Sequence, residues 1–241
     1  MLLLTFSNML IKVIGLILKI TLHPYLGDVG MSYYNVAYDI YVLLYMISTA
    51  GLPVAVSILI SESRARGNIR ETKKIFRITL ALFVVIGFVG MSIMLFGSHF
   101  FARWYRIDQS YLCIIVMAPT LFFICISSAI RGYFQGYQNM FPTSVSQIIE
   151  AVGKLVVGIL MATYAISKGY DLYVVAAFTI SGLTIGVAAG MMFLVISKLL
   201  FRASSYDAEY LRPDSDTLPI RSARTLLKTL VVMAIPITFS S

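Results

Sequence analysis

Residues 131–150 read RGYFQGYQNMFPTSVSQIIE and join two long apolar segments of the chain. The stretch begins with Arg131 at the end of one apolar segment and ends with Glu150, one to two turns inside the next. A charged side chain within the hydrocarbon region of a membrane is costly, so such residues face protein or a water-filled cavity and mark functional sites. We therefore expect Arg131 and Glu150 to lie inside a helical bundle and to take part in its function.

The apolar composition on either side of this stretch predicts an all-α, polytopic membrane helix bundle. The chain has 241 residues, of which 59% are hydrophobic and 12% charged, whereas soluble domains carry about 25% charged residues. A membrane-spanning helix needs about 20 apolar residues. Six stretches are long enough: 3–25, 33–60, 75–98, 111–135, 143–166 and 172–200. Residues 1–200 are thus expected to form a six-helix, N-terminal lobe.

The remaining residues are expected to lead from this lobe into a further part of the protein. Residues 201–224 are polar and contain Pro213 and Pro219, which is typical of a linker. Residues 225–241 read as the start of a seventh transmembrane helix, which is too short to cross a bilayer. We therefore expect the chain to be a fragment of a larger protein.

The distribution of positive charge predicts the orientation in the membrane. Six Lys/Arg residues lie in 61–77, one in 131–142 and six in 198–228, which makes 13 on one side. Three lie on the other side: Arg103, Arg106 and Lys168. Loops rich in Lys and Arg stay in the cytoplasm, so the N-terminus is expected there. The net charge of +8 then indicates contact with anionic lipids rather than with nucleic acid.

Lysines inside the first apolar segment predict a polar interior. Asn8, Lys12, Gly15, Lys19 and His23 are spaced by four, three, four and four residues and so share one helix face. A lysine at the centre of a membrane helix costs about 2.5 to 3.5 kcal/mol of insertion free energy. The favoured interpretation is a cavity lined by this face. The alternative is that the lysine stems carry their ammonium groups to the headgroups.

The remaining membrane charges can pair in more than one way. Asp39 in the second segment lies at the depth of Lys19, which predicts a Lys19–Asp39 ion pair. Glu150 and Lys154 are four residues apart on one helix, in the favourable order. Arg131 can compete with Lys154 for Glu150, which would leave one cation free to meet an anion.

Aromatic and small residues mark two further helix faces. A stripe of four tyrosines follows the second segment: Tyr34, Tyr38, Tyr41 and Tyr45. The outer two are expected to anchor the helix at the membrane interface, and the inner two fit either packing or a surface for stacking on sugar. Glycines at four-residue spacing in the sixth segment, at 182, 186 and 190, predict close approach of another helix backbone.

Motifs of soluble-enzyme chemistry are absent from the sequence. It contains no phosphate-binding GxxxxGK[ST] loop and no paired carboxylates placed for acid–base work. His23 and His99 are far apart, and Cys113 and Cys125 lie on one segment, about 18 Å apart, which is too far for a disulfide. We therefore predict a protein that is not an enzyme and needs neither metal nor cofactor.

Together, these residues resemble the polysaccharide-exporter branch of the multidrug/oligosaccharidyl-lipid/polysaccharide superfamily. That branch includes the stage V sporulation protein B type and the lipid II flippases of peptidoglycan synthesis. Residues 131–150 carry the resemblance most specifically. Weaker matches are 12–27, 48–57, 66–71 and 76–77. The resemblance implies one six-helix lobe of a MATE-like transporter with two lobes.

The resemblance also implies a function and a set of site residues. Members of the family flip undecaprenyl-diphosphate-linked sugars across the bacterial plasma membrane through a cationic cavity with alternating access. The candidate substrate-binding residues are Lys12, Lys19, Asp39, Arg131, Glu150 and Lys154. Lysines stand at 19 and 154 where the family favours arginine, and Asp39 stands where the sporulation branch usually has proline. The expected partners are a lipid-linked sugar diphosphate, membrane lipids and the missing C-terminal lobe of the same protein.

Two other functions fit the same segments. A multidrug or cation antiporter of the same fold would favour buried carboxylates over buried lysines, and this chain has more lysines. A truncated, non-transporting membrane protein is the other alternative, because the expected second lobe is missing.

Overall fold

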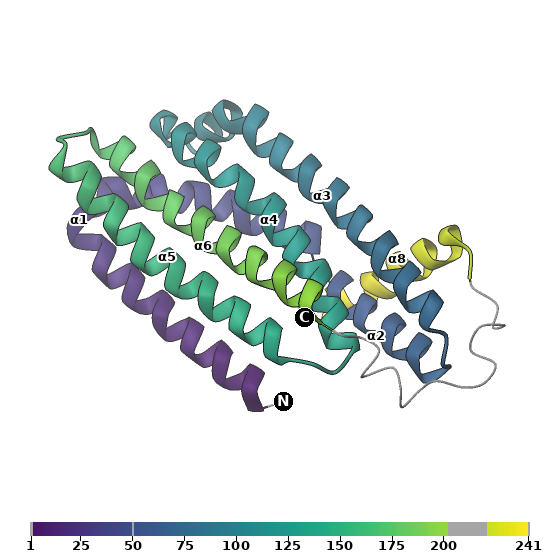
Figure 1. Cartoon of the computed structure of the whole chain (residues 1–241). Helices are drawn as coiled ribbons and strands as arrows, with labels where there is room; N and C mark the ends of the chain where they lie inside the picture. The colour runs from purple at the N-terminus through teal and green to yellow at the C-terminus, as the bar shows by residue number, and fades with distance from the viewer. Residues whose placement is uncertain (1, 50, 202–220, 241) are drawn as a thin grey trace.

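The computed structural model describes residues 2–49, 51–201 and 221–240, and every regular element within these ranges is a helix. The elements are α1 (Leu2–Thr49), α2 (Leu52–Ala65), α3 (Ile69–Trp104), η1 (Asp108–Ser110), α4 (Tyr111–Gly136), α5 (Phe141–Ser167), α6 (Leu172–Leu200) and α8 (Ala223–Ser240). The long helices lie along one another in an elongated bundle (Figure 1). The predicted all-α membrane bundle is therefore confirmed.

Five helical segments are long and apolar enough to cross a membrane: Met9–Ala65, Ile69–Trp104, Asp108–Gly136, Phe141–Ser167 and Leu172–Leu200. The first of them is interrupted at Gly27, whose φ of 58° and ψ of −172° suit a residue without a Cβ. In Figure 1 the chain runs away from the N-terminus along the first part of α1 and returns along the second. Each part spans at least about 33 Å, so both can cross a bilayer.

The second predicted segment, 33–60, has the wrong C-terminal boundary. The chain leaves the helical conformation at Gly51, whose φ is 71°, and α2 begins as a separate helix with Pro53 in its first turn. Proline is well tolerated there because the first N–H groups of a helix have no intrahelical acceptor. The membrane helix thus ends at Thr49, and α2 is a short helix of its own.

The basic residues of 61–77 lie on two helices and on the turn between them. Helix α2 ends at Ala65 and α3 begins at Ile69, on either side of Gly67. The α3 start is fixed by Asn68, whose side chain accepts a hydrogen bond from the Glu71 backbone N–H at 3.0 Å, as an N-cap residue does. The predicted linker 201–224 falls mostly outside the described residues. The helix expected from residue 225 is α8.

The two glycines of the 131–150 stretch pack α4 against α2. A Cβ on Gly132 would lie 2.8 Å from the Pro53 carbonyl oxygen, and one on Gly136 would lie 2.6 Å from Ile60 Cγ2. Both separations are too short for a real side chain, so only glycine allows this approach. The spacing of four residues places both glycines on one face of α4, and Arg131 is left to point elsewhere.

The predicted glycine face of α6 packs on α5. A Cβ on Gly186 would lie 2.7 Å from the Lys154 backbone nitrogen and 2.8 Å from the Glu150 carbonyl oxygen. On the α5 side, a Cβ on Gly153 would lie 2.8 Å from the Gly186 Cα. The two backbones therefore touch, and α6 sets the position of the α5 segment that carries Glu150 and Lys154.

The α2–α3 turn is bound to the residues that precede α8. The Arg221 Nε donates a hydrogen bond to Glu71 Oε1 at 2.5 Å, and its Nη1 lies 3.7 Å from Glu62 Oε2. The Lys74 Nζ donates to the Arg221 carbonyl oxygen at 2.8 Å. Because Glu71 is buried, this contact holds the start of α8 beside α2 and α3 (Figure 1).

Candidate functional site

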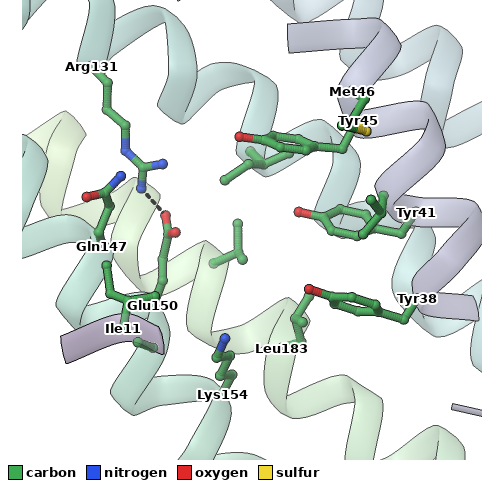
Figure 2. A pocket seen from close by; sticks show the side chains of 14 residues that line it. Ile11, Tyr38, Tyr41, Tyr45, Met46, Arg131, Gln147, Glu150, Lys154 and Leu183 are labelled. Atoms are coloured by element: carbon green, nitrogen blue, oxygen red, sulfur yellow. Dashed lines mark hydrogen bonds and ion pairs between the residues drawn. The ribbon is translucent and has the colours of Figure 1, made fainter. Parts of the chain in front are cut away.

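A cavity of about 460 Å³ lies between the two parts of α1 and helices α4, α5 and α6. We call it the central cavity. Its polar lining consists of Tyr38, Tyr41, Tyr45, Arg131, Gln147, Glu150 and Lys154. Figure 2 shows the tyrosines on one side and the charged residues on the other. The remaining lining is apolar, so the space suits an amphipathic molecule.

Arg131 and Glu150 form an ion pair in the wall of the central cavity. The Arg131 Nη2 donates to Glu150 Oε1, and its Nε donates to the Ser146 hydroxyl at 3.3 Å. The two charged side chains are 9% and 15% exposed. The Glu150 carboxylate fits there because residue 190 is glycine. A Cβ at that position would lie only 2.8 Å from Glu150 Oε1. The competition for Glu150 is thus decided in favour of Arg131.

Lys154 is the second cation of the central cavity, and its ammonium group forms no salt bridge there with the described residues. It projects into the space from α5, below the Arg131–Glu150 pair in Figure 2. It forms no salt bridge with any residue that the structure describes, although Glu150, one helical turn away, still attracts its charge. Of the two possible pairings of Glu150, the structure therefore forms the one with Arg131. An ammonium group in a partly desolvated site attracts an anion more strongly than it would in bulk water.

A second cavity, of about 300 Å³, adjoins the central one. The two share Tyr38, Lys154 and Leu183. The adjoining cavity adds Lys19 and Asn35, which come from the first and second parts of α1. Lys154 therefore borders both spaces, and a second cation, Lys19, lines the adjoining one.

The structure brings four of the six candidate residues to these cavities. Arg131, Glu150 and Lys154 line the central cavity, and Lys19 joins Lys154 in the adjoining one. Lys12 is exposed and lines neither cavity, although Ile11 beside it lines the central one. Of the predicted polar face of the first segment, Gly15 and Lys19 line a cavity, while the Asn8 side chain is outside the described part.

The predicted Lys19–Asp39 ion pair is wrong. Both side chains are exposed, and the structure contains no ion pair between them. Lys19 lines the adjoining cavity, whereas Asp39 lines neither space. Successive residues of an α-helix are rotated by about 100°, so Asp39 points away from the face that Tyr38 presents to the cavities. Equal depth in the membrane did not mean that the two side chains face each other.

Three tyrosines of the stripe, Tyr38, Tyr41 and Tyr45, face the central cavity with their hydroxyl groups (Figure 2), and Tyr34 lines the adjoining one. The rings of Tyr41 and Tyr45 stack with centroids 5.9 Å apart and planes at 17°, and the Tyr38 ring centroid lies 6.2 Å from that of Tyr41. The ring faces of Tyr41 and Tyr45 are therefore turned toward each other, as the packing alternative predicts, while the Tyr38 ring is tilted against that of Tyr41. The hydroxyl ends point across the space toward Arg131, Glu150 and Lys154 (Figure 2).

Comparison with known proteins shows which family this bundle represents. A sequence model of the family described as polysaccharide biosynthesis protein matches residues 1–241. The chain belongs to this family. The sequence-based resemblance to stage V sporulation protein B and the lipid II flippases is thereby confirmed.

Relatives from Bacillus subtilis (strain 168) show how much of a family member the chain covers. Stage V sporulation protein B is 29% identical over 191 residues, which are 79% of the chain and 36% of that protein. Lipid II flippase MurJ is 26% identical over 204 residues, 80% of the chain and 37% of MurJ. The uncharacterized membrane protein YabM is 22% identical over 237 residues, which are 98% of the chain and 42% of YabM. The chain thus spans well under half the length of these family members.

Two tyrosines of the 131–150 stretch, Tyr133 and Tyr137, contact cationic side chains at the C-terminal end of α4. The Lys198 ammonium lies 3.8 Å from the Tyr133 ring centroid, and the Arg64 guanidinium carbon lies 4.2 Å from that of Tyr137. Such cation–π contacts are strongest where water is excluded, and both tyrosines are buried. These residues therefore join α4 to α2 and α6 without taking part in the cavity.

Sequence reasoning missed the residues that position the charged pair. Ser146 holds the Arg131 guanidinium, and Gly190 leaves room for the Glu150 side chain. Their positions in the sequence could have indicated these roles. Ser146 lies one helical turn before Glu150, and Gly190 belongs to the glycine face of α6. That face indicated close helix packing, but not which side chain would occupy the space.

Proposed function

We propose that the chain is part of a flippase that moves a lipid-linked sugar diphosphate across the bacterial plasma membrane by alternating access. The observation that carries this proposal is the Lys154 ammonium, which borders the central cavity and forms no salt bridge with a described residue. Arg131 neutralises the carboxylate beside it. The family and the chain's similarity to lipid II flippase MurJ support the same class of substrate.

The physical reason lies in the cost of moving a diphosphate through a membrane. An anion in a low-dielectric interior is strongly disfavoured unless a cation and hydrogen-bond donors accompany it. Lysine supplies a compact positive charge with three donors. Lys154 borders both cavities and Lys19 lines the second. The anion can therefore pass from one space to the other while a cation remains near it, as the lipid tail stays in the membrane.

Lys12 and Asp39 are proposed to contact the substrate or a second lobe outside the two cavities. Both are exposed, and both belong to the parts of α1 that border the cavities. The greater length of the relatives supports a second lobe that would cover these residues. The proposed partners are therefore the lipid-linked sugar diphosphate, the surrounding lipids and that lobe.

The charges of the central cavity favour a flippase over a multidrug or cation antiporter. An antiporter that binds cations needs a carboxylate available to them. Among the residues lining the central cavity, the carboxylate is Glu150, and Arg131 already pairs with it. The available charge is the positive one of Lys154, which fits an anionic substrate.

Replacing Lys154 with alanine in the full-length protein is expected to reduce transport about tenfold or more, because it removes a charged hydrogen-bond donor from the substrate site. Complementation of a flippase-deficient strain measures this. Lys154→Arg keeps the charge and is expected to preserve most growth. Lys168→Ala, on the residue that follows α5 and outside both cavities, is the matched control. Normal growth with Lys154→Ala at equal membrane levels would refute the proposed role of this lysine.

We also propose that the N-terminus and the α2–α3 turn are cytoplasmic, on the basis of the 13-to-3 asymmetry in Lys and Arg. The α5–α6 turn lies at the opposite end of the bundle (Figure 1). Ala65 and Ser167 flank these two turns and are exposed, while Cys113 and Cys125 are buried. An impermeant maleimide added to intact cells is expected to label Ser167→Cys and not Ala65→Cys. The reverse pattern would invert the proposed orientation.

A further inference from the structure

One wall of the central cavity is a row of three phenol hydroxyls. They belong to Tyr38, Tyr41 and Tyr45, whose spacing of three and four residues places them on one face of α1. Contacts between neighbouring rings hold the row in place: Tyr38 and Tyr41 are tilted with centroids 6.2 Å apart, and Tyr41 and Tyr45 are stacked at 5.9 Å. The hydroxyl ends point into the space opposite Arg131, Glu150 and Lys154 (Figure 2).

These hydroxyls lack hydrogen-bond partners within the described part of the chain. Tyr33 on the same helix differs, because its hydroxyl donates to Gln109 Oε1 at 2.7 Å. The amide oxygen of Gln147, which also lines the central cavity, is buried and has no partner among the described residues. Since buried polar groups are nearly always hydrogen-bonded, the buried Gln147 oxygen calls for a donor. The tyrosine hydroxyls face the same space and can bond to a ligand there.

We propose that this hydroxyl row recognises the sugar of a ligand whose diphosphate meets Lys154. A phenol hydroxyl both donates and accepts, and an amide oxygen accepts, so together they match the alternating donors and acceptors of a polyhydroxylated ring. Lys154 stands across the space from the row (Figure 2), which places a sugar attached to the diphosphate beside the tyrosines. This inference rests on the proposed function of the cavity and adds the group that gives it selectivity.

The row would let the site distinguish its substrate from the sugar-free carrier. The charge of Lys154 attracts any lipid diphosphate, whether or not a sugar is attached. A site built to hydrogen-bond hydroxyl groups discriminates against a ligand that lacks them, because its polar groups then stay unpaired. The tyrosines should therefore govern binding of the sugar and leave binding of the bare diphosphate unchanged.

Two soluble probes separate these contributions in the full-length protein held in lipid nanodiscs. Geranyl diphosphate carries the anion without a sugar, and geranyl-diphosphate-linked N-acetylglucosamine carries both. Tyr41→Phe and Tyr45→Phe should each weaken binding of the sugar-bearing probe about three- to tenfold and change binding of geranyl diphosphate less than about twofold. Lys154→Ala should weaken binding of both probes alike. Tyr164→Phe, on α5 and outside both cavities, is the matched control.

The possible outcomes distinguish the hydroxyl row from the cation site. If the Tyr→Phe variants bind the sugar-bearing probe as the native protein does, or lose affinity for both probes equally, the row does not recognise the sugar. The Lys154 site would survive that result. If the native protein binds neither probe, both proposals are overturned. Phenylalanine keeps the ring stacking, so thermal unfolding should show native stability for each Tyr→Phe variant.

Discussion

Replacing Arg131 with alanine is expected to lower the free energy of unfolding by about 3 kcal/mol, because it leaves a largely buried carboxylate without its counter-charge. The Glu150 side chain is 15% exposed and is held over Gly190 by close packing, so it has little freedom to turn toward water. Ser146 would also lose the hydrogen bond that it accepts from Arg131. Unfolding of the purified protein in mild detergent, followed by circular dichroism, measures the change.

Two further variants show whether the buried charge is the cause. Adding Glu150→Gln to Arg131→Ala removes the uncompensated charge and should recover most of the stability. Arg66→Ala breaks a matched pair with Glu62 at an exposed site, where the side chains are 56% and 33% exposed. Exposed pairs contribute about 1 kcal/mol at most. If Arg131→Ala costs no more than Arg66→Ala, the ion pair in the cavity wall is not a structural requirement.

Replacing Gly186 with alanine is expected to destabilise the protein by about 1 to 3 kcal/mol or more, because overpacking forces the backbone to move. The added Cβ would lie 2.7 Å from the Lys154 nitrogen and 2.8 Å from the Glu150 carbonyl oxygen. Backbone atoms cannot turn aside as a flexible side chain can. The α5 segment would therefore shift together with both of its charged residues, and transport should fall along with the melting temperature.

A matched glycine on α1 provides the control for this substitution. Gly15 is helical, and a Cβ there would meet nothing within 4 Å. Gly15→Ala should therefore be neutral or stabilising by up to about 1 kcal/mol, which is the gain in helix propensity. Equal melting temperatures for Gly15→Ala and Gly186→Ala would show that α5 and α6 are not in close contact.

The fold class and most of the helices could be predicted because a bilayer imposes a length on apolar segments. The fifth predicted segment, 143–166, differs from α5 by two residues at its start and one at its end. The break at Gly51 was missed because residues 50–56 are all apolar across it. Hydropathy records whether a residue tolerates lipid, and it carries no information about a positive φ.

The candidate site could be predicted only as a set of charges on helix faces. Both Arg131 and Lys154 were within reach of Glu150 by sequence, and the choice between them depends on how α4 and α5 meet. The Lys19–Asp39 prediction failed because depth along a helix does not specify direction around it. The hydroxyl orientation of the tyrosines likewise depends on ring packing, which periodicity does not determine.

The central claim is that the central cavity holds a lipid-linked sugar diphosphate, and photocrosslinking in living cells tests it most directly. Met46→p-benzoylphenylalanine places the reactive group in the lining of the central cavity. Ile47→p-benzoylphenylalanine places it on the next residue, which is exposed and outside both cavities. We expect mass spectrometry to find a lipid diphosphate sugar attached at position 46 and not at position 47. Equal capture at both positions, or no such adduct at position 46 in a protein that still complements, would contradict the claim.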